Sequence, residues 1–238
     1  MSRPDQAPVR TARTPVRTPG WFAPLHRVLA EARADQLSRF SPPPGHHRRS
    51  AVLLLFGEGR AGVDVLLTER SPSLRSHAGQ VSFPGGRLDP EDDGPIAAAL
   101  REAVEETGLD VEGVQVQGCL PDLYLPPSDY AVTPVMAWWH HPSPVRVVDE
   151  AEVARVVRVP VAELVDPANR FLVSHPSGFV GPGFAVRELF VWGFTAGILD
   201  RVIQLAGWER PWDASRVEPV PALPEPAQVD TIEAGGQA

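Results

Sequence analysis

The chain has 238 residues, and its 43% hydrophobic and 22% charged content is that of a globular protein with a real core. A net charge of −8 argues against non-specific nucleic-acid binding, and apolar runs no longer than residues 51–56 (AVLLLF) are too short to span a membrane. The single cysteine, Cys119, excludes an internal disulfide framework and a cysteine-rich zinc site.

The two ends of the chain differ from its middle in composition. Residues 1–20 are rich in arginine and proline and have no apolar stretch of the kind that signal peptides need, so we expect a disordered basic arm. Residues 213–238 are proline-rich and acidic, which predicts a disordered tail. With no secretory or peroxisomal signal, we expect a cytoplasmic protein whose folded domain spans residues 21–212.

The predicted elements alternate between helices and strands. Apolar residues at helical spacing predict an amphipathic helix over residues 21–40. Two β-like runs at 51–56 and 63–68, joined by a glycine-containing loop, predict a hairpin. Further elements are expected as follows: a short strand at 80–83, a helix from Asp92 or Asp93 to Thr107, strands at 113–120, 130–139 and 153–159, a turn or short helix at 159–167, and a closing helix at 190–204. This order predicts an α/β sandwich around a mixed sheet.

The helix that ends at Thr107 carries three carboxylates on one face. Glu102, Glu105 and Glu106 stand at i, i+3 and i+4, where like charges repel. A hard divalent cation such as Mg²⁺ or Mn²⁺ over this face would make the arrangement favourable, whereas a solvated acidic surface is the alternative. The opposite face is apolar and predicts a docked helix with its acids directed outward; it comprises Ile96, Ala99, Leu100, Ala103 and Val104.

A glycine turn precedes this helix. Residues 83–86 (FPGG) can bring backbone carbonyl and N–H groups close to a ligand, because glycine allows a close approach of the main chain. Together with the acidic helix face, the turn favours a metal site over a solvated surface.

Residues 86–109, GRLDPEDDGPIAAALREAVEETGL, resemble the Nudix box, whose usual form is G-x5-E-x7-R-E-U-x-E-E-x-G-U with U aliphatic. The part from Arg101 to Leu109 fits this form. Two departures are visible. Gly86 lies fifteen residues before Arg101 where the general box has fourteen, and Asp92 or Asp93 replaces the seventh-position glutamate. The brace that this acid usually makes to the arginine would then come from an aspartate.

The preceding segment resembles a narrower group. Residues 66–86, LLTERSPSLRSHAGQVSFPGG, are similar to the signature LLTxRSxxLxxHxGQxxFPGG of coenzyme A diphosphatases, which share the lengthened box. Residues 125–135, 159–170 and 190–199 also look like this subfamily, so that the resemblance covers roughly residues 50–206.

The resemblance implies a Nudix fold, an α/β/α sandwich, and hydrolysis of the pyrophosphate of coenzyme A or acyl-CoA with Mg²⁺ or Mn²⁺. The products would be 4′-phosphopantetheine, or its acyl form, and 3′,5′-ADP. The residues that it implies are Arg101, Glu102, Glu105, Glu106 and Glu152 for catalysis, Gly85, Glu102, Glu105 and Glu106 for the metal, and Arg70, Arg75, Gln80 and Phe83 for the substrate. Glu152 could instead belong to a surface acidic turn, and each arginine to the surface or to a structural brace.

Two other functions remain open at this point. One is a Nudix pyrophosphatase for another nucleotide, such as NADH, ADP-ribose or a nucleoside triphosphate. The other is a non-catalytic Nudix-like module that senses a nucleotide. In each case the partner is a small molecule, with no nucleic acid or membrane involved, and the chain is either a monomer or a homodimer.

Overall fold

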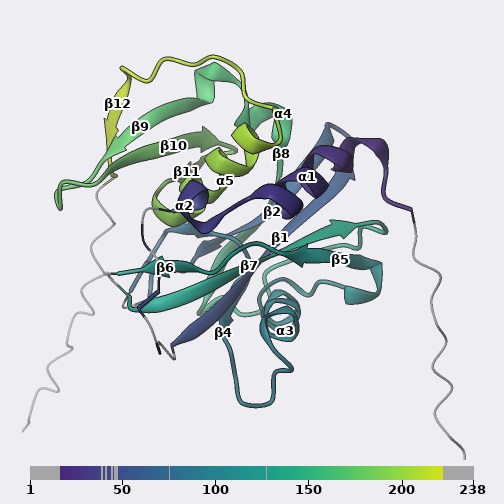
Figure 1. The fold of residues 1–238 in the computed structure, drawn as a ribbon. Coiled ribbons are helices and arrows are strands. Elements are labelled where there is room, and N and C mark those ends of the chain that lie inside the picture. The colour runs from purple at the N-terminus through teal and green to yellow at the C-terminus, as the bar shows by residue number, and fades with distance from the viewer. Residues whose placement is uncertain are drawn as a thin grey trace, which may run out of the picture.

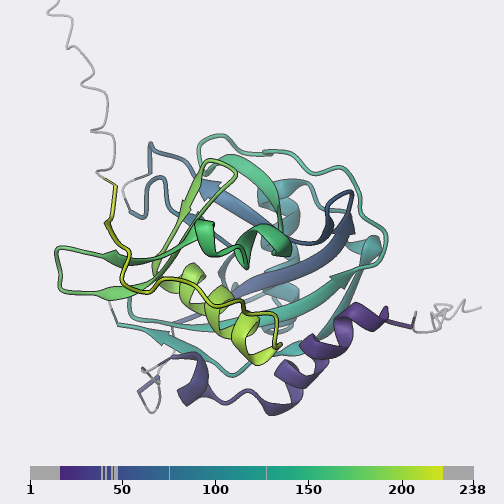
Figure 2. The same cartoon turned by 90° about the horizontal axis from the view of Figure 1, so that it is seen from above.

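The computed structural model describes residues 17–38, 40, 42–43, 45, 48–74, 76–126 and 128–221. Within these residues, a mixed sheet of eight strands lies between helical layers (Figure 1). Helix α3 (Pro95–Thr107) packs on one face. Helices α1 (Ala23–Glu31) and α5 (Gly193–Leu205) pack on the other face and lie across the sheet in Figure 2. The predicted α/β sandwich around a mixed sheet is confirmed.

Strand β1 (Arg49–Gly59) is the centre of this main sheet. It runs parallel to β7 (Tyr130–Trp139) on one side. On its other side it pairs antiparallel with β4 (Gly85–Arg87) and then with β2 (Gly62–Arg70). The remaining strands of the sheet are β3 (Val81–Ser82), β5 (Val114–Cys119), β6 (Leu123–Leu125) and β8 (Val153–Pro160). Along this edge, the first half of β1 pairs with β4 and the second half pairs with β2. The end of β2 therefore diverges from β4, and the candidate site lies where these two strands separate.

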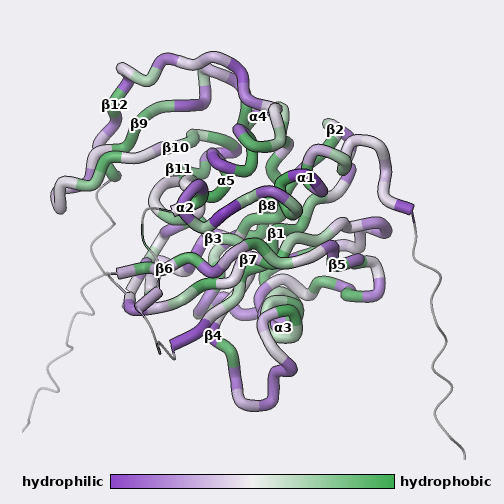
Figure 3. Tube along the Cα trace, in the orientation of Figure 1, coloured by the Kyte–Doolittle hydropathy of each residue, from purple (hydrophilic) through white to green (hydrophobic). Residues whose placement is uncertain are grey.

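The sequence of β1 is hydrophobic on both faces because both faces are covered. Ala51, Leu53 and Leu55 face α3, where Ala98, Ala99 and Ala103 allow a close approach. Leu54 and Phe56 alternate with them and face α1 and α5. In Figure 3 the strands in the centre are mostly hydrophobic, whereas the loop between β4 and α3 is hydrophilic.

The helix predicted over residues 21–40 is broken into pieces. A 3₁₀ turn, η1 (Gly20–Phe22), leads into α1, and a separate short helix, α2 (Ala34–Leu37), follows. Ala32 and Arg33 are extended, and the Arg33 N–H donates to the Gln36 side chain, which starts the second helix. The structured part therefore begins inside the predicted arm, whose residues 1–16 lie outside the described ones.

A second sheet, absent from the predicted elements, packs against α5. Its strands are β9 (Arg170–Ser174), β10 (Val180–Val186), β11 (Leu189–Val191) and β12 (Val217–Pro219). The closing helix predicted at 190–204 begins only at Gly193, because the residues before it form β11.

The prediction of disorder over residues 213–238 is wrong for β12. This strand runs parallel to β9, and its neighbours Arg216 and Val220 exchange backbone hydrogen bonds of 2.8 and 3.1 Å with that strand. These bonds satisfy backbone N–H and C=O groups at the edge of β9. A short, proline-rich segment can therefore be ordered without a hydrophobic face of its own. Residues 222–238 of the predicted tail lie outside the described part.

Short helical turns complete the fold. They are η2 (Val111–Gly113), α4 (Val161–Leu164) and η3 (Pro167–Asn169). Helix α4 confirms the turn or short helix expected at 159–167. None of the helices in the described ranges is long and apolar enough to cross a membrane.

A buried arginine ties the second sheet to α5. Arg170 at the start of β9 is 1% exposed and forms ion pairs with Asp200 of α5 and, at 3.3 Å, with Glu209. Its guanidinium lies over the Trp212 ring, 4.6 Å from the centroid. Because a buried charge needs a partner, this network fixes how β9 meets the helix.

Candidate active site

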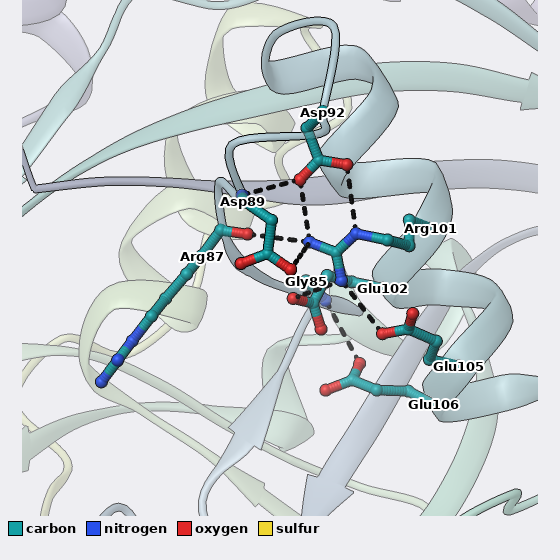
Figure 4. A network of polar contacts seen from close by, with 8 residues as sticks. All are labelled: Gly85, Arg87, Asp89, Asp92, Arg101, Glu102, Glu105 and Glu106. Carbon is teal, nitrogen blue, oxygen red and sulfur yellow. Dashed lines mark hydrogen bonds and ion pairs between the residues drawn. The ribbon is translucent and has the colours of Figure 1, made fainter.

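Helix α3 begins and ends at glycines. The helix ends at Thr107, as predicted, and Gly108, which adopts a left-handed conformation with φ 65°, caps its carboxyl end. The amino end differs from the prediction, since Gly94 with φ 87° precedes Pro95 and neither Asp92 nor Asp93 caps the helix. Asp92 is instead directed at Arg101 (Figure 4).

Arg101 joins the loop before α3 to the acidic face of the helix (Figure 4). Its guanidinium donates to Asp92 at 2.9 and 3.1 Å and to the backbone carbonyl of Arg87 at 3.0 Å. It also donates to Glu102 at 3.1 Å and to Glu105 at 3.0 Å. The hydrogen bond from Arg101 holds the pKa of Asp92 below its usual value. Asp92 therefore takes the place of the box glutamate, and Arg101 acts as a brace.

The three glutamates do not all point outward. Glu105 is mostly exposed, but Glu102 is half-buried and Glu106 is only 4% exposed. The predicted apolar face is also rotated, because Ile96 and Val104 are 40% and 39% exposed. The small residues Ala98, Ala99 and Ala103 are buried in their place, which brings the helix close to the sheet.

Glu102 and Glu106 face the two glycines of β4. The Gly85 N–H donates to Glu106 Oε2 at 3.2 Å. At Gly86, an added Cβ would lie 2.3 Å from Glu102 Oε1, so only glycine leaves room for that carboxylate. Burial raises the pKa of Glu102, and burial together with the charges of Glu102 and Glu152 raises the pKa of Glu106 to about 8. The site thus concentrates negative charge in a poorly solvated position.

Two segments from elsewhere in the chain reach the same place. The charge of Glu152 raises the pKa of both Glu102 and Glu106, and the charge of Arg70 lowers the pKa of Glu106. The backbone of Ser71 donates to the Glu152 carbonyl at 2.8 Å and so holds the end of β2 beside that loop. The charges of Arg70 and Glu152 therefore act on the carboxylates of α3, and the roles of these two residues stay predictions.

The other residues assigned to the substrate differ in their surroundings. Gln80 is half-buried, pairs through its backbone carbonyl with Arg70 N at 2.9 Å, and contacts His77 Nδ1 through its side chain at 2.9 Å. Phe83 is 1% exposed and belongs to the core between the main sheet and α5, so its side chain is not presented at the surface, and its assignment to the substrate stays a prediction. Arg75 lies outside the described residues.

The buried carboxylates fit a divalent cation. Glu102 and Glu106 offer oxygen donors, which Mg²⁺ and Mn²⁺ prefer, and a cation would offset the burial and the repulsion that raise the pKa of Glu106. Glu105 fits less well, because its carboxylate is mostly exposed and, unlike Glu102 and Glu106, does not face the glycines of β4. In the described ranges, no group of three or more His, Cys, Asp and Glu side chains is already gathered as a metal cluster, so the fit rests on the pair Glu102 and Glu106 with the backbone of Gly85 beside them.

Burial of Glu106 predicts that the metal-free protein loses stability with rising pH. The folded-state pKa of about 8 exceeds the ordinary 4.5, so the contribution of this group is complete below pH 4.5 and is lost as the pH rises through 8. Glu106→Gln removes this titration. In excess EDTA at pH 9 we expect the variant to be more stable than the wild type by on the order of 4 kcal/mol, with a much smaller difference at pH 5. Urea unfolding at both pH values measures this, and a variant less stable at pH 9 would contradict it.

Comparison with known proteins places the chain in a family. The NUDIX domain matches residues 45–183, and the chain belongs to the Nudix family. It is 40% identical over 179 residues to the uncharacterized Nudix hydrolase NudL of Shigella flexneri, covering 69% of this chain and 90% of the relative. It is also 40% identical over 161 residues to NudL of Escherichia coli K12, covering 65% and 80%. A crystal structure of the Nudix hydrolase RenU from M. smegmatis aligns with 71% of this chain and 90% of its own at 21% identity and a TM-score of 0.49.

The protein is therefore a Nudix hydrolase, an enzyme that acts on pyrophosphate bonds. The fold is the α/β Nudix fold that the box implied. Nudix hydrolases act on small nucleotide derivatives and generally use divalent ions such as Mg²⁺ or Mn²⁺. The names of the relatives do not state a substrate.

Proposed function

We propose that this Nudix hydrolase cleaves the pyrophosphate of coenzyme A or acyl-CoA and uses Mg²⁺ or Mn²⁺. The products are 4′-phosphopantetheine, or its acyl form, and 3′,5′-ADP. The observation that carries the proposal is the placement of residues 66–86, the segment that resembles the coenzyme A diphosphatase signature. Near its end, the Gly85 N–H donates to Glu106 at 3.2 Å, and near its start the charge of Arg70 acts on the same carboxylate, although fourteen residues separate the two.

The carboxylates of α3 have the central part in the proposed reaction. Glu102 and Glu106 would hold the divalent ion, and the Gly85 carbonyl would complete its ligands. Arg101, which is itself held by Asp92, keeps Glu102 in place. A bound divalent ion supplies neutralisation of the phosphate oxygens and activation of water. The proposed general base is Glu152, whose carboxylate would accept the proton of the attacking water; its charge acts on Glu102 and Glu106, which supports its place at this site.

In the proposed reaction, Arg70 binds an oxygen of the pyrophosphate. Its Nε is buried and has no hydrogen-bond partner among the described residues, and its charge reaches Glu106. A buried donor without a partner is costly, and an anionic phosphate oxygen would satisfy it. Because the pyrophosphate is common to many Nudix substrates, Arg70 contributes to turnover of all of them and not to the choice among them.

A panel of substrates tests the proposal. We expect the wild-type enzyme with Mg²⁺ or Mn²⁺ to turn over coenzyme A and acetyl-CoA at a higher kcat/KM than NADH, ADP-ribose or nucleoside triphosphates. EDTA should abolish every activity. Rapid turnover of NADH or ADP-ribose with inert coenzyme A would replace the proposal by the more general Nudix pyrophosphatase.

A further inference from the structure

Two arginines lie against one tyrosine ring beside strand β4. The guanidinium carbon of Arg48 lies 4.6 Å from the centroid of the Tyr130 ring, and that of Arg87 lies 5.6 Å from it. Arg48 directly precedes β1, Arg87 ends β4, and Tyr130 begins β7. These three residues, the Tyr130 cluster, come from segments far apart in sequence that strand pairing brings together.

The cluster lies across β4 from the metal-binding carboxylates. Side chains alternate along a strand, so with Gly86 against Glu102, Arg87 is on the opposite face. Figure 4 shows the Arg87 side chain extending away from Arg101 and the glutamates, while its backbone carbonyl accepts from Arg101. Arg87 stands two positions after Gly85 on an extended strand, so their Cα atoms are roughly 7 Å apart. A ligand at Gly85 can therefore place a second group at the cluster.

The positive charge of the cluster is poorly compensated. Arg87 is exposed and has no carboxylate partner within the described part of the chain. Arg48 has Asp129 at 3.9 Å, the outer limit of an ion pair, with both side chains about half exposed. Arg101, by contrast, contacts several carboxylates at 2.9–3.1 Å. One arginine over a tyrosine ring is common, but two guanidinium groups held at the same ring repel each other, and a bound anion would relieve this repulsion.

We propose that the Tyr130 cluster binds a phosphate monoester carried by the same substrate molecule as the scissile pyrophosphate. Planar guanidinium groups present paired N–H donors that match phosphate oxygens, and the ring holds them in position. In coenzyme A, one ribose separates the 3′-phosphate from the pyrophosphate, which suits the short span from Gly85 to Arg87. The identity of that group as the 3′-phosphate rests on the proposed function. The cluster then selects coenzyme A over dephospho-CoA.

A comparison of coenzyme A with dephospho-CoA distinguishes recognition of the 3′-phosphate from a general contribution to turnover. We expect Arg87→Ala and Arg48→Ala each to lower kcat/KM for coenzyme A by roughly ten- to a hundredfold, with a much smaller loss for dephospho-CoA, which lacks the 3′-phosphate. Arg70→Ala should instead lower kcat/KM for both substrates alike. Arg60→Ala, an exposed arginine in the distant β1–β2 turn, is the control and should match the wild type. Equal losses on both substrates for Arg87→Ala and Arg48→Ala, or no loss on either, would overturn the proposal.

Binding of product-like nucleotides tests the cluster without turnover. We expect the wild type to bind adenosine 3′,5′-bisphosphate about tenfold or more tightly than 5′-AMP in calorimetric titrations, and Arg87→Ala to lose most of this preference. A wild type that binds both nucleotides equally would overturn the cluster as a phosphate site. If coenzyme A is not hydrolysed but the preference is present and depends on Arg87, the proposed function fails and the phosphate site stands.

Discussion

Glu106→Gln should lower kcat by roughly 10²–10³-fold while the protein remains folded. The substitution keeps the shape of the side chain and its contact with the Gly85 N–H. It removes the negative charge with which the carboxylate would bind a divalent ion. Initial rates at saturating Mg²⁺ measure the effect. Glu58→Gln, an exposed glutamate near the other end of β1, is the matched control and should keep wild-type kcat.

Thermal unfolding gives a second readout of the same substitution. Mg²⁺ or Mn²⁺ should raise the Tm of the wild type, because a ligand that binds only the folded state stabilises it by about 2.7 kcal/mol at a hundred times its Kd. The rise should be much smaller in Glu106→Gln and unchanged in Glu58→Gln. Wild-type kcat in Glu106→Gln, or an equal rise in Tm, would show that Glu106 does not hold the metal.

Arg170→Met should lower the free energy of unfolding by about 3–5 kcal/mol, because it leaves the buried carboxylate of Asp200 without its cation. A loss of this size corresponds to a fall in Tm of about 10 °C for a domain of this length. Urea unfolding of the variant and the wild type measures the difference. Arg33→Met, in an ion pair whose side chains are 69% and 68% exposed, is the control and should change stability by less than about 1 kcal/mol.

The double variant Arg170→Met/Asp200→Leu separates a lost attraction from a stranded charge. If the cost arises from the unpaired carboxylate, removing both charges should recover much of the stability lost in Arg170→Met. A double variant as unstable as Arg170→Met or less stable would show that the packing of Arg170 on Trp212 and Phe184 carries the effect instead.

The positions of helices and strands are predicted best where the hydrophobic periodicity and the local start and stop signals agree. The β1–β2 hairpin, β7 and the carboxyl end of α3 lie where predicted, since continuous apolar runs mark covered strands and Gly108 ends a helix. The candidate site residues of the contiguous motif lie together, because a loop of a few residues joins β4 to α3.

The remaining features depend on contacts between distant segments. The depth of Glu106 follows from the alanines that let α3 approach the sheet, and the order of β12 follows from the open edge of β9. Spacing alone cannot show that Phe83 turns into the core. The juxtaposition of Arg87 with Tyr130 likewise requires the register of β1 with both β4 and β7.

Identification of the products formed from coenzyme A is the decisive measurement, because the proposed reaction is hydrolysis at the pyrophosphate. With Mg²⁺ or Mn²⁺, chromatography of the wild-type reaction should show 3′,5′-ADP and 4′-phosphopantetheine in equal amounts, and Glu106→Gln should yield little of either. Dephospho-CoA as the product, which means cleavage of the 3′-phosphate ester, would contradict the account. So would intact coenzyme A under conditions in which the enzyme consumes NADH or ADP-ribose.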